Sequence, residues 1–449
     1  MPVKITVVGL GKIGLPLAVQ FAGKGHSVTG VDTNPRVVES VNAGIEPFPG
    51  EAELDVRLKQ AVADGALTAT SDYSRAVPQA EYVVVVVPLF VDDEGLPDFG
   101  WMDSATTAIA AHLRAGTTVI YETTMPVGTC RTRWKPALEQ GSALTEGIDF
   151  WVVFSPERVL TGRVFADLRK YPKLIGGLDP AGAERARAFY EAVLDFDIRT
   201  DLPRPNGVWD LGSAEAAELA KLAETTYRDV NIGLANQFAR FAEANGIDAL
   251  AVIDAANSQP YSHIHRPGIA VGGHCIPVYP RLYLWNDPAA TVVRAAREAN
   301  AAMPAYAVEV LAQTYGDLSD ARVVVLGAAY RGGVKETAFS GVFGTVAALR
   351  RRGARAVVHD PLYDDDELAA LGFTAYHLGT SVDAAILQAD HPEYRAIGPA
   401  DLPGVRALVD GRAVTDESRW AGVPRRVIGV APAGEPGESP DRSWRPGRG

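Results

Sequence analysis

Cysteine is almost absent from this sequence of 449 residues, which contains only Cys130 and Cys275. Two cysteines cannot form the disulfide framework of a small secreted domain, so the composition favours a reducing cytoplasm. The N-terminus lacks the parts of a signal peptide, and no apolar run reaches the roughly 18 residues of a membrane span. We therefore expect a cytoplasmic protein with no membrane segment.

The chain also lacks a surplus of basic residues. Its 43 Lys and Arg are outnumbered by 55 Asp and Glu, which gives a net charge of −12 and argues against broad nucleic-acid binding. The sequence contains neither a Cys-x-x-Cys nor a His-x-x-x-His ligand set, so we predict no zinc site. Hydrophobic residues make up 47%, which is typical of a folded protein, and the length suggests two or three domains.

The N-terminal region has the pattern of an α/β domain. A β-branched run over Lys4–Gly9 precedes a predicted helix over Ile13–Lys24 and a second strand over His26–Val31. This order favours a parallel sheet with helices on both faces. Apolar runs predict further strands over Tyr82–Val87, Thr117–Tyr121 and Phe150–Phe154. The first domain is predicted to span residues 1–200.

The pattern changes after a Pro-, Gly- and Asp-rich candidate linker, Asp201–Gly212. Ala214–Ala244 has no proline and a single glycine, and predicts one long helix; Thr291–Gln313 is a second helical stretch. We assign residues 201–314 to a central helical region and 315–430 to a second α/β domain, with strands over Val323–Gly327 and Ala356–Asp360. Residues 431–449 are predicted to be a disordered tail. The predicted fold is thus two Rossmann-like, doubly wound domains joined by a long central helix.

The segment Gly9-Leu10-Gly11-Lys12-Ile13-Gly14 is a G-x-G-x-x-G motif between the first strand and the first helix. Gly9 permits the tight turn, Gly11 lets the backbone approach a pyrophosphate, and Gly14 lets the helix pack on the strand. Asp32 ends the next strand, where it can bind a ribose 2′-hydroxyl and repel a 2′-phosphate. This context favours NAD over NADP, and over a glycine turn without a ligand. The predicted cofactor residues are Gly9, Gly11, Lys12, Ile13, Gly14, Asp32 and Arg36.

Two reactive side chains stand out further along the chain. Cys275 follows Gly272-Gly273-His274, and a thiolate in such a turn could attack a carbonyl carbon, although many lone cysteines are simply buried. Lys221 shares a face of the long helix with Glu218, Thr225 and Arg228. Among small apolar neighbours a lysine can serve as a base, but a solvated lysine would fit the same pattern.

Five segments together resemble the UDP-glucose/GDP-mannose dehydrogenase family. They occur in the family's order: Gly9–Gly14 with Asp32, Thr123–Gly128, Ser155–Leu160, Ala217–Asn231 and Gly272–Pro277. The forms Pro-Glu-Arg-Val-Leu and Gly-Gly-His-Cys-Ile-Pro-Val are most similar to the UDP-N-acetylmannosamine branch. The resemblance covers residues 3 to 430 and implies an NAD domain, a central helix that builds a homodimer, and a C-terminal domain for a nucleotide sugar.

The resemblance also implies roles for individual residues. Cys275 matches the nucleophile and Lys221 the base, while Thr124 and Glu157 match positions that order the reactive water. Thr124 is also expected near the cofactor. The residues implied to bind the substrate are Glu157, Arg158, Val159, Lys221, Arg266, Gly272, Arg331 and Arg412.

The chain departs from the family pattern in the segment 331–337, where Arg331 replaces a Lys, and at three further positions. Tyr279 replaces an Asp four residues after the cysteine, Thr225 replaces an Asn four residues after the lysine, and Tyr261 replaces a substrate-contacting Arg. The resemblance implies oxidation of a UDP-sugar C6 alcohol to the uronate with two NAD⁺, through a thiohemiacetal and a thioester on Cys275. Because of these replacements, two alternatives stay open. The enzyme could stop at the aldehyde or epimerise the sugar, or the chain could be a nucleotide-sugar-binding paralogue without activity.

Overall fold

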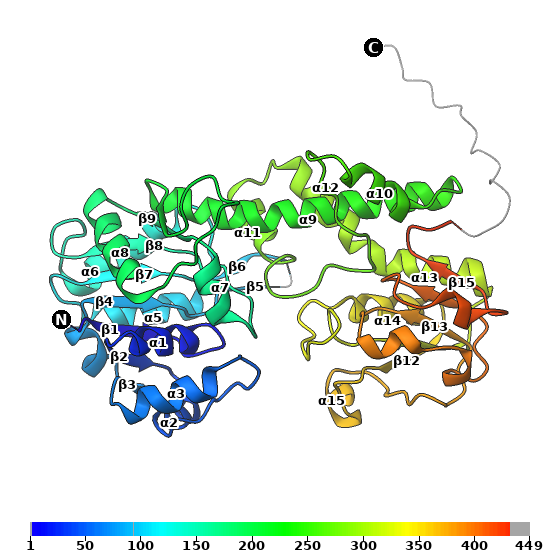
Figure 1. Ribbon diagram of the computed structural model, residues 1–449, viewed down its shortest axis with the longest axis horizontal. Coiled ribbons are helices and arrows are strands. Elements are labelled where there is room, and N and C mark those ends of the chain that lie inside the picture. The colour runs from blue at the N-terminus through cyan, green and yellow to red at the C-terminus, as the bar shows by residue number, and fades with distance from the viewer. Residues whose placement is uncertain (1, 93, 432–449) are drawn as a thin grey trace, which may run out of the picture. The chain divides into compact units, whose positions relative to one another are not determined.

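The computed structural model describes residues 2–92 and 94–431, which form two compact units (Figure 1). The first unit contains the chain up to Glu224 together with Arg281–Asn286. The second contains Thr225–Pro280 and the residues from Asp287 onward. Residues 432–449 of the predicted tail lie outside the described residues.

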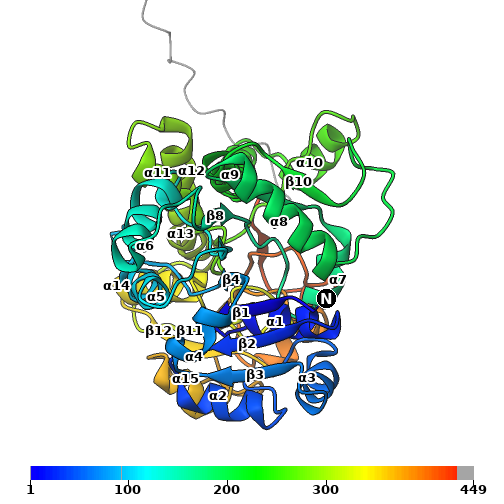
Figure 2. The same ribbon diagram turned by 90° about the vertical axis from the view of Figure 1, so that its left-hand side faces the viewer.

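The first unit is built on an eight-stranded sheet with the order β10-β9-β8-β7-β4-β1-β2-β3. From β3 to β8 this is the strand order of a dinucleotide-binding fold, with the order reversing between β1 and β4. Figure 2 shows β3, β2, β1 and β4 beside one another. The strands are β1 (Lys4–Val8), β2 (Ser27–Val31), β3 (Leu67–Thr70), β4 (Tyr82–Val85), β7 (Thr118–Tyr121), β8 (Trp151–Phe154), β9 (Lys173–Gly177) and β10 (Val208–Asp210).

One pairing in this sheet differs from the all-parallel arrangement that the sequence pattern favoured. β9 runs antiparallel to β8, with Phe154 opposite Gly176 and Val153 opposite Gly177. β10 lies within the predicted linker Asp201–Gly212 and pairs in parallel with β9. The linker therefore contains the edge strand of the first sheet.

Helices pack on this sheet through apolar and aromatic side chains. Phe189 of α8 lies against Phe21 of α1 and stacks on Tyr82, with ring centroids 5.4 and 4.5 Å away. The helices are α1 (Gly14–Gly23), α2 (Pro35–Asn42), α3 (Leu54–Ala63), α4 (Tyr73–Ala76), α5 (Gly100–Ala110), α6 (Lys135–Ser142), α7 (Val164–Lys170) and α8 (Pro180–Val193). Short elements are the 3₁₀ turn η1 (Val77–Gln79), the π-helical turn η2 (Cys130–Trp134) and a hairpin of β5 (Phe90–Val91) and β6 (Pro97–Asp98).

The long helix α9 (Ala214–Ala244) has the predicted bounds, and runs from the first unit into the second. The second unit holds a parallel sheet with the order β12-β11-β13-β14-β15. Its strands are β11 (Arg322–Leu326), β12 (Arg355–His359), β13 (Ala384–Leu387), β14 (Leu408–Asp410) and β15 (Arg425–Val427). The two sheets confirm the predicted pair of doubly wound α/β domains.

The remaining helices include one correction. The stretch Thr291–Gln313, predicted as one helix, is two, because Pro304 cannot continue a helix and instead occupies the first turn of the second one. The helices are α10 (Ala249–Asn257), α11 (Tyr279–Asn286), α12 (Thr291–Ala301), α13 (Met303–Tyr315), α14 (Gly341–Arg351) and α15 (Asp365–Ala370), with 3₁₀ turns η3 (Pro392–Ala396), η4 (Pro399–Asp401) and η5 (Glu417–Trp420). Over residues 2–92 and 94–431, no helix has the length and apolarity that crossing a membrane requires.

Candidate active site

The glycine motif forms a tight turn between β1 and α1. Gly9 has a φ of 92°, and a Cβ on Gly14 would lie 1.8 Å from the Gly9 carbonyl oxygen, so larger residues are excluded at both positions. A Cβ on Gly11 would meet nothing within 4 Å, so the backbone there is open to approach. Ile13, the N-cap of α1, makes no side-chain capping hydrogen bond, and the first turn of α1 contains no acidic residue. This arrangement suits the pyrophosphate of a dinucleotide.

Asp32 lies directly after β2 and faces this turn. Its carboxylate accepts hydrogen bonds from the Leu10 amide at 2.9 Å and the Asn34 amide at 2.8 Å. A carboxylate has about four acceptor sites, so these two bonds leave capacity for ribose hydroxyls. Lys12 and Arg36, also predicted to contact the cofactor, are exposed beside the turn and at the start of α2. The residues present therefore fit a bound NAD.

Lys221 is one of three consecutive contacts that α9 makes with loops of the first unit. Its side chain is only 6% exposed, and Nζ donates to the Glu157 carbonyl oxygen at 2.6 Å. One turn earlier, Glu218 accepts from the Gly128 and Cys130 amides, and one turn later Glu224 pairs with Arg158 at 3.0 Å. The burial of Lys221 excludes the solvated alternative that the helical pattern had left open.

Thr124 lies in the loop that Glu218 holds. The Thr124 side chain is buried, and its neighbour Thr123 donates to the Val87 carbonyl oxygen at 2.6 Å. Burial raises the pKa of Glu218 to about 7, although the Cys130 and Gly128 amides oppose this shift. The loop carrying Thr124 is thus anchored to α9 one turn from Lys221.

Glu157 lies at the carboxyl edge of the sheet, just after β8. One carboxylate oxygen accepts from the Arg158 amide at 2.6 Å and the Val159 amide at 3.0 Å. The other accepts from the Lys173 ammonium at 2.9 Å, and this same ammonium contacts Glu122 at 2.8 Å. Sequence reasoning did not single out Lys173 or Glu122. In the sequence, each is recognisable only as a charged residue at the end of an otherwise apolar strand.

The two cysteines occupy contrasting environments. Cys130 is fully buried, and burial raises the pKa of its thiol well above the usual value. Cys275, in the second unit, is partly accessible, and its carbonyl accepts from the Tyr279 amide at the start of α11. The description of a fully packed thiol therefore fits Cys130, whereas Cys275 is partly accessible.

The turn that carries Cys275 packs on Tyr330. A Cβ on Gly272 would lie 2.4 Å from the Tyr330 Cβ, and Gly273 has a φ of 90°. The Gly273 amide also donates to the Ala338 carbonyl oxygen at 2.8 Å. The two glycines thus let the cysteine turn lie directly against the segment after β11.

Two of the four arginines predicted to bind the substrate, Arg331 and Arg412, lie near the same tyrosine. Arg331 donates to the Tyr330 hydroxyl at 3.2 Å, and Arg412 donates to the Tyr330 carbonyl oxygen at 3.1 Å. The Nε of Arg412 is buried without a hydrogen-bond partner among the described residues. Arg266 is exposed and pairs with Asp254 of α10. The second unit thus brings Arg331 and Arg412 together, while Arg266 contacts a different element.

Three of the departures from the family pattern, Thr225, Tyr279 and Tyr261, also differ in environment. Thr225 is fully buried in α9, Tyr279 is partly buried at the start of α11, and Tyr261 is 92% exposed. Thr225 and Tyr279 both make contacts within the structure. Tyr261 is thus the departure whose side chain is most accessible.

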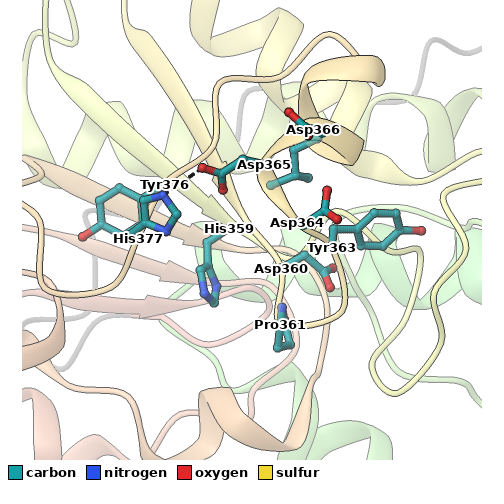
Figure 3. Close-up of a pocket in the computed structure, with 10 residues that line it drawn as sticks. His359, Asp360, Pro361, Tyr363, Asp364, Asp365, Asp366, Tyr376 and His377 are labelled. Carbon is teal, nitrogen blue, oxygen red and sulfur yellow. Dashed lines mark hydrogen bonds and ion pairs between the residues drawn. The ribbon is translucent and has the colours of Figure 1, made fainter.

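A surface cavity of about 560 Å³ in the second unit contains none of the predicted site residues (Figure 3). It lies between the end of β12, α15 and the segment Tyr376–His377, and His377 contacts Asp365 at 3.1 Å. In the part of the chain that the structure describes, no group of His, Cys, Asp and Glu side chains could hold a metal ion. This cavity therefore adds nothing to the predicted site.

Comparison with known proteins covers nearly the whole chain. Three domain models of the UDP-glucose/GDP-mannose dehydrogenase family match: the NAD binding domain at residues 3–194, the central domain at 215–302 and the UDP binding domain at 324–417. The predicted family resemblance is thereby confirmed.

Individual relatives carry related names. UDP-N-acetyl-D-mannosamine dehydrogenase of Pyrococcus horikoshii is 34% identical over 427 residues, covering 92% of this chain and 96% of the relative. The solved structure of the P. horikoshii enzyme has a TM-score of 0.83 and covers 95% of this chain and 99% of its own. NDP-N-acetyl-D-galactosaminuronic acid dehydrogenase of Ralstonia nicotianae is 30% identical, covering 93% and 97% of the two chains.

Proposed function

The chain belongs to the UDP-glucose/GDP-mannose dehydrogenase family and is an NAD-dependent nucleotide-sugar dehydrogenase; we propose that it oxidises the C6 alcohol of a UDP-sugar to the uronate. The observation that carries this proposal is the enclosed Lys221, whose Nζ donates a hydrogen bond to the Glu157 carbonyl oxygen in the same unit as the dinucleotide turn. A UDP-sugar is favoured because the C-terminal match is to a UDP binding domain. UDP-N-acetylmannosamine or a similar sugar is favoured by the names of the relatives.

NAD⁺, when bound at the Gly9–Gly14 turn, supplies the two-electron acceptor for each oxidation. The complete reaction converts the alcohol, two NAD⁺ and one water into the carboxylate, two NADH and three protons. We assign contact with the cofactor to Gly9, Gly11, Lys12, Ile13, Gly14, Asp32, Arg36 and Thr124.

The protein's own residues divide the chemistry into two parts. Lys221 accepts the proton of the C6 hydroxyl as the alcohol becomes an aldehyde. The Cys275 thiolate then adds to the aldehyde carbon, and oxidation of the resulting thiohemiacetal leaves a thioester. Water held by Thr124 and Glu157 attacks the thioester, and the thiolate leaves as the uronate forms.

The remaining substrate contacts are assigned residue by residue. Arg331 and Arg412 suit the negative charges of the nucleotide diphosphate, because one guanidinium group can donate two parallel hydrogen bonds to phosphate oxygens. We assign substrate binding to Glu157, Arg158, Val159, Lys221, Arg266, Gly272, Arg331 and Arg412. Along the chain we propose an NAD-binding region at 1–200, a central dimerisation region at 201–314 and a nucleotide-sugar region at 315–430. Cytoplasmic localisation stays a prediction of the composition.

We propose a homodimer built on α9 because apolar side chains along this helix are exposed. Tyr227, Leu234, Phe238 and Phe241 are 54%, 45%, 38% and 62% exposed, at a spacing that repeats along one side of a helix. Large exposed apolar patches mark interaction surfaces. Light scattering should give the mass of a dimer, and Phe241→Asp should reduce it to a monomer. Val56→Asp, at an exposed position of α3, is the matched control, and a monomeric wild type would contradict the assembly.

A panel of UDP- and GDP-sugars with NAD⁺ tests the reaction. We expect two NADH and one uronate for each molecule of one UDP-sugar. One NADH per sugar would identify an enzyme that stops at the aldehyde, and none would identify epimerisation, the outcomes that Thr225 and Tyr279 keep open. Tight binding of NAD and nucleotide sugar without turnover would identify a paralogue that only binds.

The Lys221→Ala variant tests the first half of the mechanism. Alcohol oxidation should fall on the order of 100-fold or more, because the base is lost. Oxidation of a supplied aldehyde should be less impaired, although thioester hydrolysis can also use Lys221. Lys135→Ala, a partly exposed lysine of the same unit, should leave both rates unchanged.

A further inference from the structure

A buried ion cluster lies behind the Glu157 carboxylate. The side chain of Lys173 is 5% exposed, and those of its partners Glu122 and Glu157 are 0% and 10% exposed. The fully buried Tyr190 donates its hydroxyl proton to Glu122 at 2.5 Å. Charges at this depth require partners, because an unpaired ion away from water is strongly destabilising.

The antiparallel strand β9 explains how this lysine reaches the site. The carboxyl ends of the parallel strands β7 and β8 lie at one edge of the sheet and lead to Glu122 and Glu157. Because β9 runs the opposite way, its first residue, Lys173, lies at that same edge. The pairing of Phe154 with Gly176, continued along both strands, sets residue 157 opposite residue 173. A parallel β9 would have placed this lysine at the far edge.

We propose that Lys173, Glu122 and Tyr190 are positioning residues that hold the Glu157 side chain as an ionised, oriented acceptor while its carbonyl oxygen holds Lys221. The inference rests on the function proposed above. Both oxygens of the Glu157 carboxylate are engaged, one by two amides and one by Lys173. The Glu157 carbonyl oxygen accepts from Lys221 at 2.6 Å. One residue thus links the ion cluster to the base on α9.

The charges in the cluster favour a proton on Glu122 over one on Glu157. Burial raises the pKa of Glu122, and the neighbouring Glu157 adds to this effect against the opposing charge of Lys173. Burial acts on Glu157 too, but the Lys173 charge and hydrogen bonds outweigh it and lower the pKa of Glu157. Burial also disfavours the charged form of Lys173, yet its two carboxylate partners raise the pKa of this lysine overall.

Groups from several elements surround the cluster. Lys173 comes from β9, Tyr190 from α8, and Lys221 from α9, where Glu224 neutralises the adjacent Arg158. The result for the reaction is that Glu157 stays a carboxylate near neutral pH, so a water molecule between it and Thr124 meets a full negative acceptor. Removing Lys173 would leave two buried carboxylates facing each other, and Glu157 would then take up a proton more readily.

Two substitutions should move the acid limb of the kcat–pH profile in opposite directions. In Lys173→Met the limb should move to higher pH by about one pH unit or more, because Glu157 loses its cation. The kcat for uronate formation should fall on the order of 100-fold, while the KM for the nucleotide sugar changes little. In Glu122→Gln the limb should move to lower pH, because Lys173 then acts on Glu157 alone.

Controls separate positioning from folding. Glu122→Gln preserves shape, so it carries the test even if Lys173→Met does not fold. Lys173→Arg should restore most of the wild-type profile, and Lys135→Met, elsewhere in the same unit, should not move it. Acid limbs unchanged in both cluster variants, or shifted the same way in both, would overturn the inference while leaving the proposed function standing. A wild type that oxidises no nucleotide sugar would overturn both.

Discussion

The two α/β units repeat one local arrangement with different consequences. In each, the first strand of the fold ends in a left-handed glycine, Gly9 with a φ of 92° and Gly327 with a φ of 107°. In each, an aspartate after the next strand accepts hydrogen bonds from the amides that follow this glycine, Asp32 in the first unit and Asp360 in the second. A strand, a glycine turn and an aspartate are therefore a structural device of the fold and do not by themselves make a dinucleotide site.

The two units differ in how many acceptor sites of the aspartate carboxylate are occupied by the protein's own donors, and in how soon a helix follows the glycine turn. Asp360 is buried and accepts from the Ala328, Ala329 and Leu362 amides and from His391, which fills the capacity of a carboxylate. Asp32 is partly accessible and accepts from two amides. In the first unit, helix α1 starts five residues after Gly9. In the second unit, the next helix after Gly327 is α14, which starts only at Gly341. Among the residues that the structure describes, only the first unit has both a glycine turn followed closely by a helix and an aspartate with unused acceptor capacity.

The largest effect on this comparison is expected from Gly11→Val. The new side chain would enter open space, so the fold should be kept, but it would occupy the approach to the backbone that a pyrophosphate needs. NAD affinity should fall at least ~100-fold, or about 2.7 kcal/mol. Calorimetric titration with NAD and a thermal melt measure the two quantities. Gly23→Ala, at the other end of α1, is the control, and unchanged affinity in Gly11→Val would contradict the assignment of the turn.

The next effect concerns the second unit. Asp360→Asn should lower the free energy of unfolding by about 2 kcal/mol, because buried donors lose a charged acceptor, while NAD affinity stays unchanged. Burial acts to raise the pKa of Asp360, but hydrogen bonds from His391 and the Ala329 and Leu362 amides lower it overall. The native state therefore binds this proton less readily than the unfolded chain.

Because folding lowers the pKa of Asp360, the destabilisation caused by Asp360→Asn should depend on pH. The stabilisation is complete above the ordinary carboxyl pKa and is lost as the pH falls through the lowered pKa of the folded state. The difference in the free energy of unfolding between wild type and variant should thus be constant near neutral pH and become smaller in acid. Denaturant unfolding at several pH values measures it, with the exposed Asp366→Asn as control. A gap that widens in acid would show that Asp360 is not held as a carboxylate.

The smallest effect is expected on cofactor choice. Wild type should prefer NAD over NADP, because the Asp32 carboxylate would face a 2′-phosphate. Asp32→Ala should reduce the ratio of the two kcat/KM values about tenfold, or roughly 1.4 kcal/mol. Asp360→Asn removes the matching charge of the second unit and should leave the ratio unchanged. Equal use of both cofactors by wild type would refute the role of Asp32.

Local signals explain what the sequence could predict. The motif from β1 to Asp32 was recognisable because each residue type meets a requirement of one short turn, and α9 was predicted with its observed bounds because 31 residues lack a strong helix breaker. The burial of Lys221 was left open, since helical spacing states which residues share a face and not what covers it.

Long-range pairing explains what the sequence could not predict. Strand propensity does not state direction, so the antiparallel β9 and its Lys173 were missed, and with them the contact to Glu157. The break between α12 and α13 has a visible cause in the sequence, Pro304. The prediction of one helix gave more weight to the apolar pattern on both sides of this proline. The distances between charged side chains depend on strand pairing, so they can be obtained only from the folded structure.

The central claim, covalent oxidation on Cys275, is tested most directly by the mass of the peptide that carries it. Wild type mixed with NAD⁺ and the active nucleotide sugar, then stopped quickly in acid, should carry an acyl nucleotide sugar on Cys275. Cys275→Ser should bind both ligands without forming uronate at a comparable rate, while Cys130→Ala should keep turnover and the adduct. Uronate formation by Cys275→Ser at near wild-type rate, with no adduct in the wild type, would contradict the account.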